Sequence, residues 1–145
     1  MISTKELSIK TKRKFQIIDI TNLVKKEILK SGIKEGLVTI LSKHTTAAIR
    51  INEEESLLLK DIESFFKKIT RNDKEYFHDD ISKRKNCEKN EPKNAASHLQ
   101  ALLMGNSESL VVKDKKLLLG KWQRILFIEL DGPRKRSFLV NIVGK

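Results

Sequence analysis

The sequence contains little cysteine and no long apolar run. A single cysteine, Cys87, among 145 residues excludes an intramolecular disulfide framework and a four-cysteine zinc site. No apolar run approaches the ~20 residues that span a bilayer. The N-terminus lacks the apolar stretch of a signal peptide, so we expect a cytoplasmic protein with no membrane partner. No internal repeat and no Pro/Gly/Ser linker divides the chain, and its length predicts one domain over residues 1–145.

Acidic residues are the minority charge. The chain has 30 Lys and Arg against 19 Asp and Glu, which gives a net charge of +11 at pH 7. Nucleic-acid binding is typical of clustered basic patches with interleaved aromatic residues. Here one Trp, one Tyr and no arginine-rich arm accompany the charge, and the basic excess is spread through the terminal thirds of the chain. This pattern favours a lysine-rich solvated surface over a nucleic-acid partner.

Hydrophobic periodicity predicts the elements of the first two thirds of the chain. Alternating β-forming residues predict one long strand or a hairpin over 6–20, and strands over 36–42 and 45–51. Helical spacing predicts a helix over 22–31, capped by Thr21 and closed by Gly32, an amphipathic helix of about 16 residues from Glu53, and a short helix over 95–104. Residues 79–93 are polar and aperiodic, which predicts a loop.

The C-terminal part predicts further strands, over 109–112, 117–119, 123–130 and 137–143. The turn signal Asp131-Gly132-Pro133-Arg134 lies between the last two, so we expect them to pair as a hairpin. Short connections require antiparallel pairing. The order of elements therefore predicts an α+β fold, with helices packed on an antiparallel sheet or sandwich.

The three histidines, His44, His78 and His98, all lie at predicted element boundaries or in a short helix. Histidine suits both proton transfer near neutral pH and zinc binding. No two of them are close in sequence, so their spacing gives no metal motif, and three unrelated histidines are an equal alternative. Glu53 lies at the junction of a strand and a helix, where a carboxylate can act in catalysis or simply stabilise the helix by ~0.3–1 kcal/mol.

The turn after residue 130 concentrates cations. Arg134 and Arg136 lie in it next to Asp131. Guanidinium groups bind carboxylate and phosphate bidentately, so this turn can form an anion cradle, and an ordinary charged turn is the alternative. Trp122, the single tryptophan, follows Gly120 at the start of a predicted strand and suits an apolar contact at an interface.

Taken in order, these fragments resemble the YjbQ family, which is often labelled secondary thiamine-phosphate synthase. Each fragment is weak by itself, whereas their order and spacing from about residue 5 to residue 144 are specific. The stretch 82–92 does not match strongly, and we expect it to vary in length and order. The matching fragments are His44-Thr45-Thr46-Ala47-Ala48, Asn52-Glu53, Asp61, Tyr76-x-His78, Asn94-Ala95-Ala96-Ser97-His98-Leu99, Gly105, Gly120-x-Trp122-Gln123 and Glu129-x-Asp131-Gly132-Pro133-Arg134-x-Arg136.

The resemblance implies a β-sandwich with helices packed against it, the YjbQ-like fold, assembled as a homotrimer around a threefold axis. It also implies a pocket lined by the family's histidines, which fall here on His44, His78 and His98. These three and Glu53 are the expected catalytic residues. The groups expected to bind the anionic substrate or support the pocket are Thr45, Thr46, Asn94, Ser97, Asp131, Arg134 and Arg136.

The family label implies that a hydroxymethylpyrimidine diphosphate is joined to a thiazole phosphate, giving thiamine phosphate and pyrophosphate. This chemistry requires that the departing diphosphate be neutralised, typically by Mg²⁺ together with Lys, Arg or backbone N–H groups. Arg134, Arg136 and the hydroxyls of Thr45 and Thr46 can serve there, with a histidine as general acid or base. The sequence contains neither an Asp-rich magnesium motif nor a Gly-rich phosphate loop.

Two other functions remain open at this stage. If the three histidines converge, they can hold zinc with a water as fourth ligand, and Glu53 can act as base in a zinc-dependent hydrolase. Alternatively, protonated imidazoles bind a phosphorylated metabolite without turnover. The natural substrate of such a hydrolase is a phosphate ester or an amide. The expected partner is a small phosphorylated molecule. Zn or Mg is the expected metal, and we expect no organic cofactor.

Overall fold

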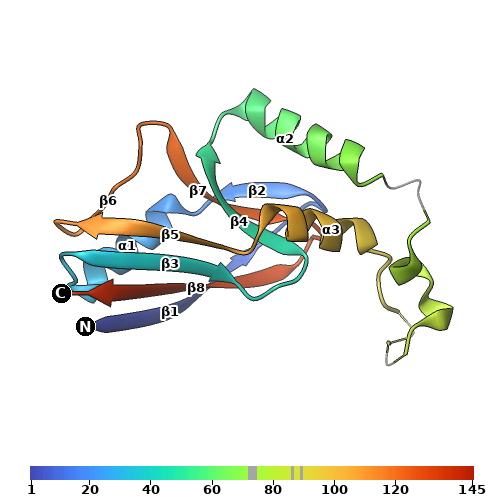
Figure 1. The fold of residues 1–145 in the computed structure, drawn as a ribbon, viewed down its shortest axis with the longest axis horizontal. Helices are drawn as coiled ribbons and strands as arrows, with labels where there is room; N and C mark the ends of the chain where they lie inside the picture. The colour runs from blue at the N-terminus through green and yellow to red at the C-terminus, as the bar shows by residue number, and fades with distance from the viewer. Residues whose placement is uncertain (72–74, 86, 89) are drawn as a thin grey trace.

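Two antiparallel sheets form the body of the molecule (Figure 1). The computed structural model describes residues 1–145 except 72–74, 86 and 89. The five-stranded sheet has the order β1 (Ile2–Lys10), β8 (Lys135–Gly144), β3 (Gly36–Ser42), β5 (Ser107–Lys113) and β6 (Lys116–Leu117). The three-stranded sheet has the order β2 (Gln16–Asp19), β7 (Gln123–Glu129) and β4 (Ala47–Glu53).

Three α-helices accompany the sheets within the described part of the chain: α1 (Thr21–Ser31), α2 (Ser56–Ile69) and α3 (Ala95–Met104). Gly32 ends α1 in the left-handed conformation, with φ of 74°, as predicted. Thr21 does not cap that helix. Its hydroxyl accepts a hydrogen bond from the backbone N–H of Ile125 instead, at 2.8 Å, which ties α1 to β7.

α2 begins three residues later than Glu53, because β4 continues through that residue. The carboxylate of Glu55 caps the helix by accepting from the backbone N–H groups of Leu57 and Leu58, at 2.9 and 2.8 Å. Two short 3₁₀-helices lie at the start of the predicted loop 79–93: η1 (Phe77–Asp79) ends at its first residue, and η2 (Ile81–Lys83) lies within it. No helix in the described residues is both long and apolar enough to cross a lipid bilayer.

Strand pairing is antiparallel throughout, as predicted, but two predicted pairings are wrong. Residues 6–20 form neither one strand nor a hairpin, because β1 pairs with β8 and β2 pairs with β7 in the other sheet. β7 and β8 also belong to different sheets, so they do not form a hairpin. The turn reverses the chain as expected. However, it places the two strands face to face across the core, where Phe127 and Phe138 have ring centroids 6.0 Å apart.

The main core lies between the two sheets and α1, and a second apolar cluster lies on the opposite face of the three-stranded sheet. β7 serves both, because Ile125 and Phe127 point into the main core while Leu126 and Ile128 point into the second cluster. The second cluster includes Ala101 and Met104 of α3, and this packing holds α3 against the sheet. The α+β class and the packing of helices against antiparallel sheets are confirmed.

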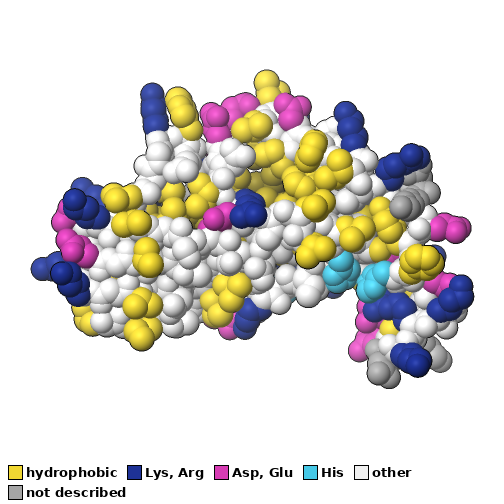
Figure 2. All heavy atoms as spheres, viewed as in Figure 1, with side chains coloured by type: hydrophobic (Ala, Val, Ile, Leu, Met, Phe, Trp, Pro, Cys, Tyr) yellow, Lys and Arg dark blue, Asp and Glu magenta, His cyan; other side chains and the backbone are white. Residues whose placement is uncertain are grey.

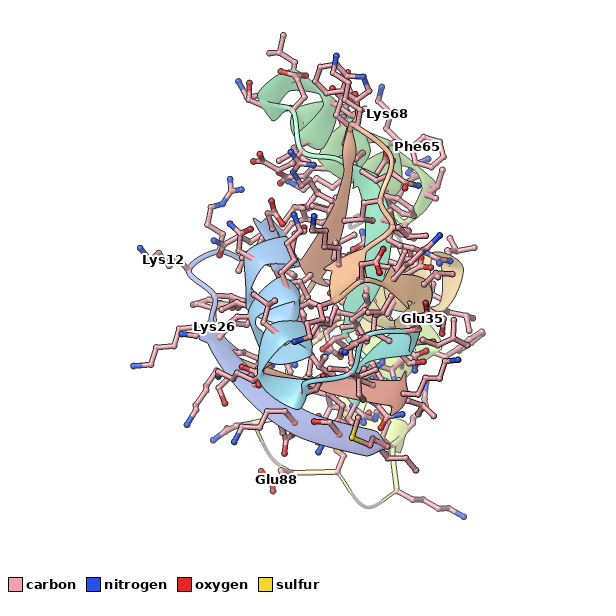
Figure 3. All side chains as sticks on the ribbon, turned by 90° about the vertical axis from the view of Figure 1, so that its left-hand side faces the viewer. Lys12, Lys26, Glu35, Phe65, Lys68 and Glu88 are labelled. Atoms are coloured by element: carbon pink, nitrogen blue, oxygen red, sulfur yellow. The ribbon has the colours of Figure 1, made fainter. Side chains whose placement is uncertain are left out.

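α2 packs loosely on this body (Figure 1). None of its residues is fully buried, although its apolar residues follow one face. Leu59, Ile62 and Phe66 reach the second cluster. Phe65 is 57% exposed, and Figure 3 shows it with Lys68 on the helix at the outer end of the molecule. This helix therefore leaves much apolar surface uncovered within one chain.

Candidate functional site

Two of the histidines, His78 and His98, meet edge to face. Their ring centroids are 4.8 Å apart with an interplanar angle of 73°. His98 lies on α3 and His78 lies in η1, and the carboxylate of Asp79 accepts from the backbone N–H of Ala95 at 3.0 Å. That bond fixes η1 to the first turn of α3. Figure 2 shows histidine side chains gathered on one face with basic side chains beside them.

The environment of His98 keeps its ring neutral at physiological pH. Burial lowers the pKa of His98 below its usual range, and the neighbouring His78 lowers it further. The carboxylate of Asp131 acts in the opposite direction on this pKa, as does the backbone of Thr45. A neutral imidazole can accept a proton, and its protonated form is a stronger acid than free imidazole.

The ring of His44 is fixed by a hydrogen bond from β8. The backbone N–H of Ser137 in β8 donates to Nε2 of His44 at 3.0 Å. Because Nε2 accepts, we assign the proton of the neutral ring to Nδ1. Burial lowers the pKa of His44, and the cation of Arg136 adds to the effect. His44 is therefore suited to donate a hydrogen bond from Nδ1 rather than to act as a base.

A buried ion pair lies behind His44. The guanidinium of Arg136 donates to the carboxylate of Glu129 through Nε at 2.7 Å and through Nη2 at 2.6 Å. Nη2 also donates to the hydroxyl of Thr46 at 2.9 Å. Burial alone would raise the pKa of Glu129, but the Arg136 guanidinium and the backbone N–H of Asp131 outweigh it and hold that pKa below its usual value. These contacts fix the chain on both sides of the site.

Asp131 connects the remaining predicted residues. Its Oδ2 accepts from Nδ2 of Asn94 at 2.9 Å and from Nη2 of Arg134 at 2.7 Å. The hydroxyl of Ser97 donates to the backbone oxygen of Leu130 at 2.6 Å. The start of α3 is therefore tied to the turn after β7, and the partly exposed guanidinium of Arg134 is fixed near the histidines.

A large open pocket meets this cluster at Asn94. Its volume is about 1070 Å³, and it opens between the segment around η1, the start of α3 and Lys14. Asn94, Tyr76 and Lys93 are among the residues that line it. The Oδ1 atom of Asn94 is buried without a hydrogen-bond partner among the described residues. Such a volume is ample for a small-molecule ligand.

The structure brings together most, but not all, of the predicted site residues. One cluster contains both rings of the histidine pair and the residues around Asp131: His78, His98, Asn94, Asp131 and Arg134. The backbone of Thr45 contacts this cluster by a hydrogen bond with His98. His44, Thr46 and Arg136 lie on its inner side, and the last two support the site through Glu129. Ser97 holds the turn, while the Thr45 side chain is exposed.

Glu53 does not lie with the histidines of its own chain. It pairs with Gln123 at one end of β4, whereas Ala47 pairs with Glu129 at the other end, next to the histidines. Six residues of strand separate these ends, which is about 20 Å at ~3.3 Å per residue. Within one chain, therefore, Glu53 does not reach the histidines, because β4 carries it away from them; its role as a catalytic residue stays a prediction.

The histidines do not form a ready zinc site. Among the residues that the structure describes, no three His, Cys, Asp or Glu side chains are placed to hold a metal ion. Nε2 of His44 is engaged by Ser137, and the other two rings contact each other edge to face. Because these residues do not fit a three-histidine zinc site as they lie, we assign no chemical step to zinc, and metal binding stays a prediction.

Sequence reasoning missed two charged residues of this region. Glu129 belongs to the recognised pattern, but it was not assigned to the site. A carboxylate in the apolar run of β7 is a signal that could have identified it, because such a group must be paired when buried. Arg84 lies close enough to lower the pKa of His98. It comes from the aperiodic segment after η2, where no pattern in the sequence distinguishes one cation from another.

Comparison with known proteins gives consistent matches. The family described as "UPF0047 protein YjbQ-like" matches residues 5–145. A UPF0047 protein of Methanothermobacter thermautotrophicus is 42% identical over 144 residues, which cover 99% of this chain and 94% of that protein. A UPF0047 protein of Archaeoglobus fulgidus is 43% identical over 135 residues, covering 93% of this chain and 97% of that one.

Solved structures agree with the fold. A crystal structure of a YbjQ-like protein of unknown function from Sulfolobus solfataricus superposes with a TM-score of 0.90 at 36% identity, covering 100% of this chain and 99% of that chain. A conserved protein of the yjbq/upf0047 family from Clostridium acetobutylicum gives a TM-score of 0.85 at 38% identity, over 96% of this chain and 99% of that one. Both likenesses extend over nearly the full length.

Proposed function

The chain belongs to the YjbQ-like UPF0047 family, and on that premise we propose that it is an enzyme with thiamine-phosphate-synthase-like activity on small phosphorylated substrates. The observation that carries this proposal is the contact between His78 and His98 beside the cluster of Asp131 and Arg134. This arrangement places a group that can transfer protons, the imidazole, close to the fixed guanidinium of Arg134, which can bind phosphate. The adjoining cavity has room for substrates of this size.

In the proposed reaction, a ring nitrogen of the thiazole phosphate attacks the methylene carbon of the pyrimidine. A C–N bond forms, the C–O bond to the diphosphate breaks, and pyrophosphate leaves with the electron pair. The substrate diphosphate is expected to arrive as its Mg²⁺ complex. Arg134 binds an oxygen of the departing diphosphate, and the Nδ1–H of His44 is suited to donate to another. The ring of His98 is neutral in the free protein. The bound diphosphate raises its pKa so that the ring takes up a proton from solvent, and the protonated ring passes this proton to the leaving group as its charge develops.

We also propose that the active form is the homotrimer that the family resemblance implies. Uncovered apolar side chains support an association of this kind, since contiguous apolar surface of this type marks protein interfaces. Glu53 can serve as a base only across a subunit boundary, because it lies at the far end of β4 from the histidines of its own chain. The exposed apolar residues of α2 and α3 are Leu57, Phe65, Ile69, Leu99, Leu102 and Leu103.

Light scattering during size-exclusion chromatography tests the assembly. A trimer of the 16.7 kDa chain has a mass of about 50 kDa. Replacing Phe65 by serine removes a large apolar contact and should shift the mass toward that of one chain. A wild-type mass of one chain would refute the trimer. The cytoplasmic location stays a prediction.

Turnover with the two phosphorylated substrates and Mg²⁺ tests the enzyme. We expect wild-type protein to form thiamine phosphate and pyrophosphate, and the change His98→Ala to lower kcat by about 10²–10⁴-fold, the usual contribution of a general acid or base. Lys26→Ala is the control, because Lys26 extends into solvent from α1 (Figure 3).

Three outcomes of this assay separate the functions. Unchanged turnover in the single variants of His44, His78 and His98 would refute the proposed site. Ligand binding without turnover by the wild type would replace the enzyme by a binding protein for a phosphorylated metabolite. Release of inorganic phosphate from either substrate, abolished by a chelator and restored by Zn²⁺, would replace the condensation by zinc-dependent hydrolysis.

A further inference from the structure

Arg84 contains a buried hydrogen-bond donor that the protein leaves unpaired. Its Nη1 is shielded from solvent and has no hydrogen-bond partner among the described residues. The nearest recorded carboxylate oxygen is Oε2 of Glu91 at 3.8 Å, which is beyond hydrogen-bond distance. A buried cationic donor without an acceptor is costly, and native structures supply one from protein, water or ligand.

The position of Arg84 places this donor on the side of the histidine pair. The positive charge of Arg84 lowers the pKa of His98. His78 and Asp131, which belong to the cluster described above, also act on this pKa. The only carboxylate in that set, Asp131, is engaged by Arg134 and Asn94. The region therefore carries two arginines and two imidazoles against two carboxylates. Asp131 is already engaged, and Glu91 lies 3.8 Å from Nη1 of Arg84, so it leaves that donor without a hydrogen bond. This balance favours an anionic ligand.

The segment that carries Arg84 is fastened to the site. Asp80 accepts from the Ser82 hydroxyl at 2.6 Å, and the backbone N–H of Arg84 donates to the carbonyl of Ile81 at 3.2 Å. Immediately before them, Asp79 holds η1 to α3. Consecutive turns thus run from His78 to Arg84, so the guanidinium and the histidine pair belong to one local structure.

We infer that Arg84 binds a phosphoryl group of the substrate, together with His78 and His98. A phosphoryl group offers several oxygens and can accept from Nη1 of Arg84 and from an imidazole N–H at the same time. This inference rests on the proposed function and deepens it, since it assigns the diphosphate of the pyrimidine substrate to the side of the site formed by η1 and η2. It also makes Arg84 a residue that determines specificity for phosphorylated ligands.

Calorimetric titration with inorganic pyrophosphate at fixed ionic strength tests the inference without any need for turnover. We expect Arg84→Gln to weaken binding by about tenfold or more, because a charge-assisted bond to a phosphoryl oxygen is lost. Arg84→Lys should recover part of the affinity, since lysine keeps the charge without the planar fork. Lys85→Gln is the matched control: it removes the same charge from an exposed neighbouring residue and should change the affinity less than twofold.

A second readout separates ligand binding from a structural role. Pyrophosphate bound beside His98 should raise the pKa of that ring, followed by NMR, and Arg84→Gln should abolish this rise while leaving the circular dichroism spectrum unchanged. Wild-type affinity in Arg84→Gln, equal losses in Arg84→Gln and Lys85→Gln, or no binding by the wild type would each overturn the inference. Normal binding that depends on Arg84 without any turnover would uphold it while refuting the proposed activity.

Discussion

Replacing Glu129 by glutamine should lower the free energy of unfolding by about 3–5 kcal/mol, the usual loss when one partner of a buried ion pair is removed. The Glu129 side chain is fully buried, and Arg136 is only 6% exposed. The carboxylate also accepts from the Thr11 hydroxyl and from the backbone N–H groups of Leu130 and Asp131. In glutamine one of these oxygens becomes an NH₂ donor that faces other donors, and the cation of Arg136 is left buried without a counter-charge.

The expected loss is large enough to measure by heat or denaturant. For a domain of about 150 residues, 1 kcal/mol corresponds to roughly 2–4 °C in Tm, so Tm should fall by about 6–20 °C. The same loss is a large fraction of the ~5–15 kcal/mol that stabilises a typical domain. The variant should therefore unfold at a clearly lower urea concentration than the wild type.

Urea unfolding followed by circular dichroism is the assay, at one fixed protein concentration because association raises apparent stability. The double variant Glu129→Leu with Arg136→Met should lose less stability than Glu129→Gln alone, since no charge is left buried. Glu108→Gln is the control. Its partner Arg50 is 43% exposed at the side chain, so that change should cost no more than about 1 kcal/mol.

The outcome also has a pH signature. Because the pKa of Glu129 is held below its ordinary value of 4.5, this group stabilises the fold above that pH, and the stabilisation is lost as pH falls through the lower, folded-state pKa. Glu129→Gln should remove that part of the acid dependence. A loss below about 1 kcal/mol for Glu129→Gln, or a double variant as costly as the sum of its single changes, would contradict this account of the pair.

Further predictions concern the histidines, the largest sheet and the metal. The pKa of the His98 ring, measured by NMR, should lie below its usual value of 6.5. Because the unfolded chain then binds more protons near that pH, the contribution of this ring to the free energy of unfolding falls as pH drops below 6.5. A measured pKa at or above 6.5 would contradict this. Gly36→Ala should lower stability by about 1–3 kcal/mol in urea unfolding, because a Cβ there would lie 2.0 Å from the Val143 carbonyl oxygen, and an unchanged midpoint would show that the strands adjust. Metal analysis of purified protein tests the predicted metal. Zinc that is bound by the wild type and lost when all three histidines are replaced by alanine would show that the rings rearrange into a metal site, and protein without stoichiometric zinc would contradict the zinc prediction.

Local patterns in the sequence predicted the elements well and their neighbours poorly. The helix over 95–104 and the end of α1 at Gly32 are as expected, because periodicity and a left-handed glycine act within a few residues. Strand partners are decided by which faces must be buried across the whole molecule. The residues of β7 from 125 to 129 are all buried. Because both faces of this strand are covered, its sequence shows no alternation of apolar and polar residues from which its neighbouring strands could be predicted.

The candidate site was predictable where residue type alone restricts the chemistry. The histidines and the turn around Asp131 were identified, and the structure joins them through contacts between residues as far apart as Asn94 and Asp131. The distance of Glu53 from the histidines of its own chain was not predictable, because the sequence does not show how far β4 runs from them before α2 begins. Arg84 was missed because an unpaired buried atom is a property of three-dimensional packing.

The place of β8 in the larger sheet sets the order in which the chain can fold. β8 is the last strand of the chain, yet it lies between β1 and β3 and pairs with both. During synthesis, therefore, β1 emerges from the ribosome first and must remain without its partner until residues 135–144 follow. Only the pairings of β3 with β5 and of β5 with β6 can form earlier within that sheet. The sheet can consequently be completed only after residues 135–144 have been made, and until then the nascent chain exposes an unpaired strand that chaperones can recognise.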